Sequence, residues 1–302
     1  MNVHCVFPPY AESAITGPHL ACPLLVAVLR KAGVTASYSD WNIRAVRKSL
    51  EPAIVREVRN RVCRRLGEGH VDVQALDLLL EHGYERLAAR SLGLLRRLLG
   101  VIAAEFRMTD GHLGLLLSGQ TAEEMLHQDI ERDILVQLDK IAPDIVGISV
   151  AFSEQLPNAV RLARFLRSQR PGLRIIVGGS QINLLVEEQV RGLDESNLFD
   201  CIVLGNGETM ISDVVRSLRE SPMRLGIIRS GPITSDDLDE LPRPAFCDTT
   251  LYFRPLILPV LAQKGCYWGK CTFCDISLDY IKIFDSIDYC FSCDRFVNFD
   301  VI

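Results

Sequence analysis

Three cysteines near the end of the sequence lie within nine residues of one another and are candidate metal ligands. They are Cys266, Cys271 and Cys274, and the neighbouring Gly265 and Gly269 mark the run as a turn that neither a helix nor a strand spans. Three thiolates this close can converge on one metal centre and leave part of it open. That arrangement is typical of a reactive iron–sulfur cluster more than of a structural clamp.

A second spacing of cysteines supports a different metal. Cys290 and Cys293 form a C-x2-C pair, and 15 residues separate Cys274 from Cys290. Together with Cys271 and Cys274 they fit the pattern of a four-thiolate zinc site. We favour the iron–sulfur interpretation because it also accounts for Cys266 and for the glycine-rich, aromatic loop, and the zinc site stays open as the alternative.

The composition indicates a globular protein with one or two ordinary cores. The chain has 302 residues, of which 48% are hydrophobic and 24% are charged. A net charge of −5 leaves no broad basic surface, so nucleic acid is not an expected partner.

The thiols and the first residues predict the compartment. The chain enters an apolar strand pattern within three residues, with no basic and apolar leader, so we expect no signal peptide. Ten cysteines without an export signal argue for reduced thiols and metal chemistry. No apolar run approaches the ~20 residues that cross a bilayer. We therefore expect a cytoplasmic protein with no membrane partner.

Short apolar runs that alternate with helical periodicity predict an α/β domain with a doubly wound parallel sheet. The run 144–150 is apolar enough for a central strand that is buried on both faces. This pattern assigns residues 1–42 and 139–225 to the domain. The expected strands are 3–7, 35–39, 144–150, 174–177 and 201–204, and the expected helices are 20–32, 157–168, 184–192 and 208–218.

The remaining segments do not follow this alternation. Residues 43–138 carry apolar positions at intervals of three and four, which predicts a helical insertion. Residues 226–250 are acidic and proline-marked, so we interpret them as a linker. Residues 251–302 would then begin a second domain, with Leu256–Val260 as its first strand and the cysteine run directly after it.

Loops at the carboxyl ends of the expected strands are the candidate binding site, because ligands of open α/β sheets bind there. Glycines in these loops would let a flat ligand approach the backbone. The alternative is that they only let strands turn into helices. No G-x-G-x-x-G or phosphate-loop motif is present, which makes a nucleotide the weaker choice. The candidate residues are Pro9, Tyr10, Ser153, Gly178, Gly179, Ser180, Gly205, Asn206, Gly207 and Glu208.

The order of these features resembles a known family. The run from Gly265 to Cys274 looks like the cluster loop of radical S-adenosylmethionine (SAM) enzymes, in which three cysteines hold a [4Fe–4S] cluster and SAM binds the fourth iron. Its spacing is C-x4-C-x2-C, one residue longer than the commonest form, and Phe273 matches the family's aromatic position beside the cofactor. The loops upstream resemble the flavodoxin-like or Rossmann-like cobalamin-binding domain that precedes the barrel in B12-dependent radical SAM enzymes.

The resemblance implies three cofactors, namely a [4Fe–4S] cluster on Cys266, Cys271 and Cys274, SAM and cobalamin (B12). Cleavage of SAM would give a 5′-deoxyadenosyl radical, and methyl transfer is one outcome known in the family. No D-x-H-x-x-G motif is present, so cobalamin is expected to bind without a histidine ligand. The implied substrate is a small molecule or a peptide.

The length of the chain limits how much of such an enzyme it holds. Only 28 residues follow Cys274, whereas a barrel takes about 200. We therefore expect the radical SAM barrel to be incomplete. Two alternatives stay open: a non-catalytic cobalamin-binding module, and an α/β protein stapled by zinc through Cys271, Cys274, Cys290 and Cys293.

Overall fold

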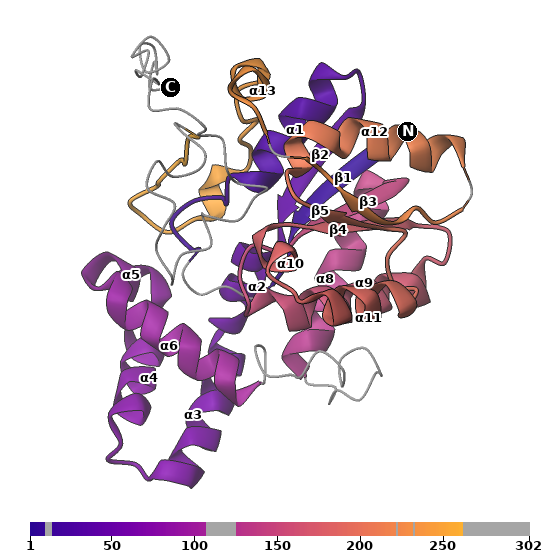
Figure 1. The fold of residues 1–302 in the computed structure, drawn as a ribbon. Coiled ribbons are helices and arrows are strands. Elements are labelled where there is room, and N and C mark those ends of the chain that lie inside the picture. The colour runs from indigo at the N-terminus through magenta and orange to yellow at the C-terminus, as the bar shows by residue number, and fades with distance from the viewer. Residues whose placement is uncertain (10–13, 107–124, 222, 232, 262–302) are drawn as a thin grey trace.

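A six-stranded sheet, parallel throughout, forms the centre of the computed structural model, which describes residues 1–9, 14–106, 125–221, 223–231 and 233–261. The strand order is β2-β1-β3-β4-β5-β6 (Figure 1). The strands are β1 (Asn2–Phe7), β2 (Thr35–Asp40), β3 (Ile145–Ser149), β4 (Arg174–Gly178), β5 (Cys201–Leu204) and β6 (Gly226–Arg229). The five strands expected from sequence are all present within one residue at each end, and the parallel α/β fold is confirmed.

Helices cover both faces of the sheet. Alternate side chains of β1 enter different cores: Val3 and Phe7 pack with α1 and α12, whereas Val6 packs in the core that α9 and α11 share. Figure 1 shows these two layers on opposite sides of the strands. The helices are α1 (Ala21–Lys31), α9 (Gln155–Gln169), α10 (Ser180–Asn183), α11 (Glu187–Glu195) and α12 (Gly207–Glu220).

Where sequence predicts one helix over 184–192, the chain forms α10 and α11 with a break between them. Leu184 and Val186 lie in this break and are 40% and 61% exposed.

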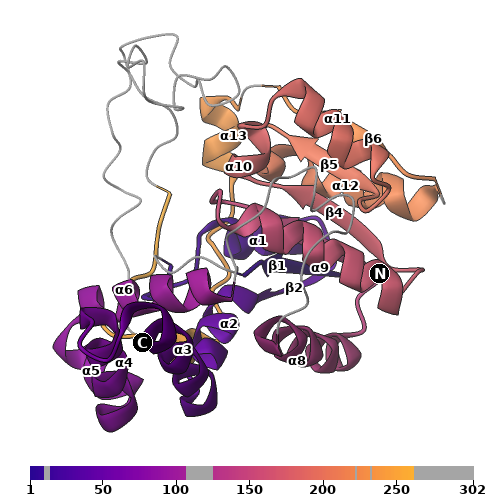
Figure 2. The ribbon, with the colours of Figure 1, turned by 90° about the horizontal axis from the view of Figure 1, so that it is seen from below.

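Within the expected helical insertion, residues 52–105 form a group of helices beside the sheet, whereas the helix 125–141 lies along the sheet next to α9 (Figures 1 and 2). The core of the insertion is continuous with one core of the sheet, because Leu98 and Phe106 belong to the same buried cluster as Val146. The carboxylate of Asp40 caps the first helix by accepting a hydrogen bond from the Ile43 amide at 2.9 Å. The helices are α2 (Trp41–Ser49), α3 (Pro52–Leu66), α4 (Val71–His82), α5 (Tyr84–Arg90), α6 (Leu92–Glu105) and α8 (Met125–Ile141).

The segment 226–250, interpreted as a linker, differs from that expectation. Its first four residues form β6, which pairs with β5 and extends the sheet by one strand. The helix α13 (Ser235–Glu240) follows, and a short 3-10 helix, η1 (Thr249–Leu251), comes after it. The run Leu256–Val260, expected to be a strand, has no regular secondary structure, and the side chain of Ile257 is 58% exposed.

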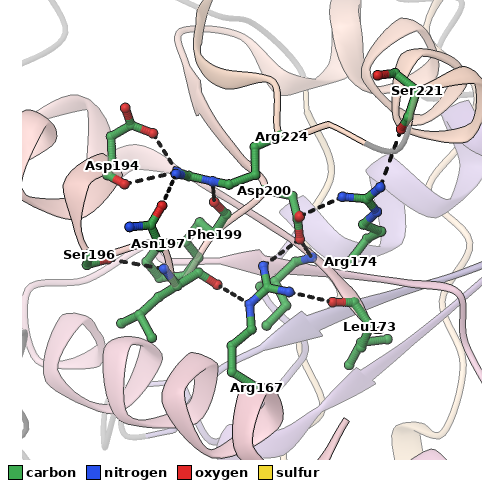
Figure 3. A network of polar contacts seen from close by, with 12 residues as sticks. Arg167, Leu173, Arg174, Asp194, Ser196, Asn197, Phe199, Asp200, Ser221 and Arg224 are labelled. Atoms are coloured by element: carbon green, nitrogen blue, oxygen red, sulfur yellow. Dashed lines mark hydrogen bonds and ion pairs between the residues drawn. The ribbon is translucent and has the colours of Figure 1, made fainter. Parts of the chain in front are cut away.

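A network of ion pairs fixes the amino-terminal edge of the sheet (Figure 3). The Asp200 carboxylate accepts hydrogen bonds from Arg167 at 2.6 Å, from Arg174 at 2.9 Å and from the Ile175 amide at 2.7 Å. Burial raises the pKa of Asp200, but these hydrogen bonds outweigh burial and hold it below its ordinary value. Arg224 adds a pair to Asp194 at 2.6 Å. The charged residues at this edge are therefore explained by their role in holding the fold. The edge lies opposite the candidate site.

Across the described part of the chain, we find no helix with both the length and the apolar character needed to cross a bilayer.

Candidate functional site

The carboxyl ends of all six strands meet at one edge, because the sheet is parallel throughout. The chain leaves β1 toward β2 on one side and leaves β3 toward β4 on the other, so the loops after β1 and β3 diverge. Such a switch point is where open α/β sheets bind ligands. The sequence-predicted loops after β1, β3, β4 and β5 are thus brought to the same edge, which we call the carboxyl edge.

Gln155 braces this switch point and was missed by sequence reasoning. Its side chain is fully buried, and its amide nitrogen donates to the Pro8 carbonyl at 2.6 Å. Its amide oxygen accepts from the backbone of Ala151 at 3.1 Å and of Phe152 at 3.2 Å. One side chain therefore joins the loop after β3 to the loop after β1. A glutamine at the start of a helix carries no local signal for a contact 147 residues away.

Three aromatic rings pack where β1 and β3 end. His19 stacks on Phe7 with ring centroids 5.0 Å apart, and Phe152 meets the His19 ring edge-on at 5.8 Å. Burial lowers the pKa of His19, which keeps the imidazole neutral at pH 7. The Nδ1 atom of His19 accepts from the Ala21 amide at 3.4 Å. His19 thus packs between the aromatic rings of Phe7 and Phe152.

Three glycines of the predicted loops have tight surroundings within the protein itself, whereas Gly207 has room for a Cβ atom. Gly179 has φ +114°, and a Cβ atom there would lie 2.4 Å from the Val150 carbonyl oxygen. Gly205 has φ +96°, and a Cβ atom would lie 2.1 Å from the Ser230 hydroxyl. At Gly178 the nearest atom to a Cβ would be the Val203 carbonyl oxygen, at 3.2 Å. The turn from strand to helix thus explains these glycines without a ligand.

Two side chains that sequence reasoning missed support the loop after β5. Asn183 accepts from the Gly205 amide at 2.7 Å and donates to the Gly205 carbonyl at 3.3 Å. Ser230, after β6, accepts from the amide of Asn206, whose own side chain is buried and donates to the Gly231 carbonyl at 3.3 Å. The predicted loop residue Asn206 is therefore a fixed part of the frame.

Other predicted residues differ in what they can offer to a ligand. Ser153 and Ser180 are exposed, and the Ser153 hydroxyl donates to the Glu154 carboxylate at 3.1 Å. Gly207 and Glu208 are half-buried at the start of α12. Pro9 is buried and lines a small hollow with Ile134. Tyr10 lies outside the described residues.

The chain after α13 folds back over the carboxyl end of β2. We call residues 241–261 the strap. The Tyr252 hydroxyl donates to Asp40 at 2.7 Å, and the Tyr38 hydroxyl donates to the Cys247 carbonyl at 3.1 Å. Burial raises the pKa of Asp40 to about 6. The strap is therefore attached to the carboxyl edge through buried polar groups that sequence reasoning missed.

The predicted metal ligands lie outside the described residues. Cys266, Cys271 and Cys274, the neighbouring Phe273, and the zinc alternative's Cys290 and Cys293 all follow Leu261, the last residue described. Within the described ranges, no group of three or more His, Cys, Asp and Glu side chains could hold a metal ion. Burial raises the pKa of Cys5 and of Cys201 to about 12, so these thiols are unreactive core residues.

Comparisons with known proteins agree with this geometry. The family model described as the B12 binding domain matches residues 115–215, a range that holds β3 to β5 and the helices between them. The six-stranded parallel sheet is consistent with such a Rossmann-like domain. The hopanoid C-3 methylase of Methylococcus capsulatus is 28% identical over 163 residues, which are 49% of this chain and 31% of the relative. The aligned part of the chain thus spans about a third of the relative's length.

Proposed function

We propose that this chain belongs to a B12-dependent radical SAM enzyme and holds cobalamin at the carboxyl edge, beside a [4Fe–4S] cluster on Cys266, Cys271 and Cys274. The observation that carries the proposal is the match to the B12 binding domain over β3 to β5, three of the six strands that form this edge, followed in sequence by the three-cysteine run. The relative is a methylase by name, which favours methyl transfer as the reaction.

The exposed side chains of the edge have chemistry that suits a corrin ring. A corrin has apolar faces and an amide-bearing rim. Leu184 and Val186 offer exposed apolar contacts in the break after α10, and the exposed hydroxyls of Ser153 and Ser180 can bond to amides. Gln155 holds the loop after β3 in place beneath them.

The protein's own part in such a reaction is to bind and orient. Bound SAM, cluster and cobalamin would supply one-electron cleavage of SAM and a transferable methyl group. Neutral His19 carries no charge into the edge, and the braced loops give the ring a fixed surface. The thiolates of the cysteine run would anchor the cluster.

A bulky side chain at the edge tests where cobalamin binds. Ser180→Trp should abolish binding of hydroxocobalamin, measured by its visible absorption after gel filtration of the full chain. The matched control is Ser217→Trp, because Ser217 is also exposed but lies near the end of α12, on the opposite side of the sheet. Equal binding by both variants would exclude cobalamin from the carboxyl edge.

Two cysteine variants separate iron from zinc. Under anaerobic reconstitution with iron and sulfide, Cys266→Ala should lose the cluster absorption and Cys290→Ala should keep it. A zinc site would behave in the opposite way, since it uses Cys290 and leaves Cys266 free. Zinc bound in equal stoichiometry with no uptake of iron would refute the radical SAM part. Cobalamin binding without cleavage of SAM would favour the non-catalytic module.

A further inference from the structure

The strap and two helices of the insertion, α2 and α5, meet at a single cation. Arg47 lies on α2, and its Nε donates to the Leu251 carbonyl of the strap at 2.6 Å. Its guanidinium carbon lies 5.6 Å from the ring centroid of Tyr84, on α5, and 5.3 Å from that of Phe253, on the strap. The two rings pack edge to face at 6.0 Å. We call Arg47, Tyr84 and Phe253 the clamp.

The clamp is held by more than one kind of contact. A guanidinium over two aromatic faces gains from both, and more so where the rings are shielded from water. Phe253 is 3% exposed, and Tyr84 is half-buried. The Tyr84 hydroxyl also accepts from Arg47 at 3.2 Å. The insertion thus adds a cation–π contact and a ring contact that the sheet alone does not provide.

Beside the clamp, the strap lies against the loop after β1. The Phe253 amide donates to the Ile15 carbonyl at 2.9 Å, and the Ile257 amide donates to the Thr16 carbonyl at 2.8 Å. A Cβ atom on Gly17 would lie 1.7 Å from the Ile257 carbonyl oxygen, so the two backbones are in direct contact. Along the chain the strap therefore contacts β2 first, through Cys247 and Tyr38, and α5 afterwards, through Phe253 and Tyr84.

We propose that the helical insertion is a positioning device, which holds the strap at the carboxyl edge through the clamp and thereby sets where the cysteine run starts. This inference rests on the proposed function, because it concerns the placing of the cluster ligands relative to cobalamin. Arg47 and Tyr84 are positioning residues. The strap has only the three residues of η1 as regular structure, so its placement depends on such contacts.

The first test needs no cofactor. In Tyr84→Ala, hydrogen exchange of the Phe253 and Ile257 amides should quicken at least about tenfold, because one side of the clamp is lost. Tyr84→Phe keeps the ring and loses only the hydrogen bond from Arg47, so its exchange should stay much closer to the wild type than that of Tyr84→Ala. Arg47→Gln removes the guanidinium that α2 contributes to the clamp, so these amides should exchange as fast as in Tyr84→Ala. Amides of β4 serve as the internal control for folding. Unchanged exchange in both Tyr84→Ala and Arg47→Gln would overturn the proposal.

The second test uses the full chain loaded with cobalamin and a reconstituted cluster. The dipolar interaction between cob(II)alamin and the reduced cluster, seen by electron paramagnetic resonance, should weaken in Tyr84→Ala and be restored in Tyr84→Phe. An unchanged interaction despite faster exchange would overturn the positioning role. Wild-type protein that takes up neither cofactor would refute the proposed function, whereas faster exchange in Tyr84→Ala would still support the clamp.

Discussion

Single residues stabilise the loops of the carboxyl edge in two different ways. Gly179 and Gly205 are fixed by the backbone conformation, and Gln155 and Asn183 use their amides to satisfy loop backbone. Asp40 is the residue of this edge whose protonation should affect stability most. Its side chain is 7% exposed and accepts hydrogen bonds from both the Ile43 amide and the Tyr252 hydroxyl. Such residues fix the loops of the edge through contacts within the protein.

Asp40 should make stability depend on pH. Burial raises its pKa from 3.8 to about 6, so the folded protein binds more protons than the unfolded chain between these values. The free energy of unfolding should therefore fall as pH rises from about 4 to about 6, by up to about 3 kcal/mol. Asp40→Asn keeps a helix-capping group and should remove this fall. Urea denaturation at pH 4, 5 and 7 measures it.

The comparison for Asp40 is Asp248→Asn, which removes an exposed carboxylate that pairs with Arg44 in the same neighbourhood. This control should keep the wild-type pH profile. Parallel profiles for wild type and Asp40→Asn would contradict the assignment.

A methyl group at Gly179 should destabilise the fold. Gly179→Ala places a Cβ against the Val150 carbonyl at a positive φ, which should cost about 2 kcal/mol or more. Gly172→Ala has open space around it and should stay within about 0.5 kcal/mol of the wild type. Thermal denaturation followed by circular dichroism compares the two. Equal stabilities would mean that the turn after β4 can relax.

At the level of elements, ion pairs hold one edge of the sheet, and loops form the other edge. Asp200 and its two arginines join α9, β4 and the start of β5 at the amino-terminal edge. Glycine turns and exposed hydroxyls occupy the carboxyl edge. The ion pairs at the amino-terminal edge therefore hold the strands, and the strands set the positions of the loops at the carboxyl edge.

Removing the charge of Asp200 should loosen that fixed edge. Asp200→Asn leaves Arg167 and Arg174 without their shared carboxylate. The free energy of unfolding should fall by about 3 kcal/mol, which is near the low end for buried pairs because both arginines are partly exposed. Because the pKa of Asp200 is lowered, the ionised carboxylate stabilises the folded protein at pH values above its ordinary pKa of 3.8. This stabilisation is lost as pH falls through the folded-state pKa.

The measurement for Asp200→Asn is urea denaturation at pH 7 and at pH 3, where wild type and variant should approach one another. Asp213→Asn, which breaks an exposed pair with Arg216 on α12, should change little. An Asp200→Asn variant as stable as Asp213→Asn at pH 7 would show that the network adds nothing.

Sequence predicts those elements whose pattern is local. β1, β3, β4 and β5 are largely apolar runs bounded by turn residues, and β2 buries every second residue, so all five carry a local strand pattern, whereas β6 offers only Ile227 and Ile228 at a half-buried edge. Leu256–Val260 is the opposite case: the run is apolar, which predicts a strand, but it pairs with no described strand. The contacts of Gln155 and Tyr252 join residues more than 140 positions apart, and no local pattern encodes them.

For the whole molecule, the parts are joined into one framework. The insertion shares a core with the sheet, and the strap contacts both the sheet edge and α5 (Figure 2). A ligand bound at the carboxyl edge would therefore stabilise the described part of the chain as a unit.

Cobalamin should accordingly raise the melting temperature. At a free concentration of 100 times its Kd, it adds about 2.7 kcal/mol, which corresponds to a rise of about 5–10 °C for a domain of this size. Differential scanning fluorimetry with and without hydroxocobalamin measures the rise. Ser180→Trp should show none, and a rise of equal size in that variant would place binding elsewhere.

The position of β6 decides where the chain can be divided. Each of the four residues of β5 is buried and pairs with β6 on one side. A shortened protein that ends at residue 225 would leave this side of β5 with open backbone groups, which invites strands of other molecules to pair there. A self-contained corrinoid carrier cut from this polypeptide would have to extend past Arg229, and past Tyr252 if Asp40 is to keep its partner.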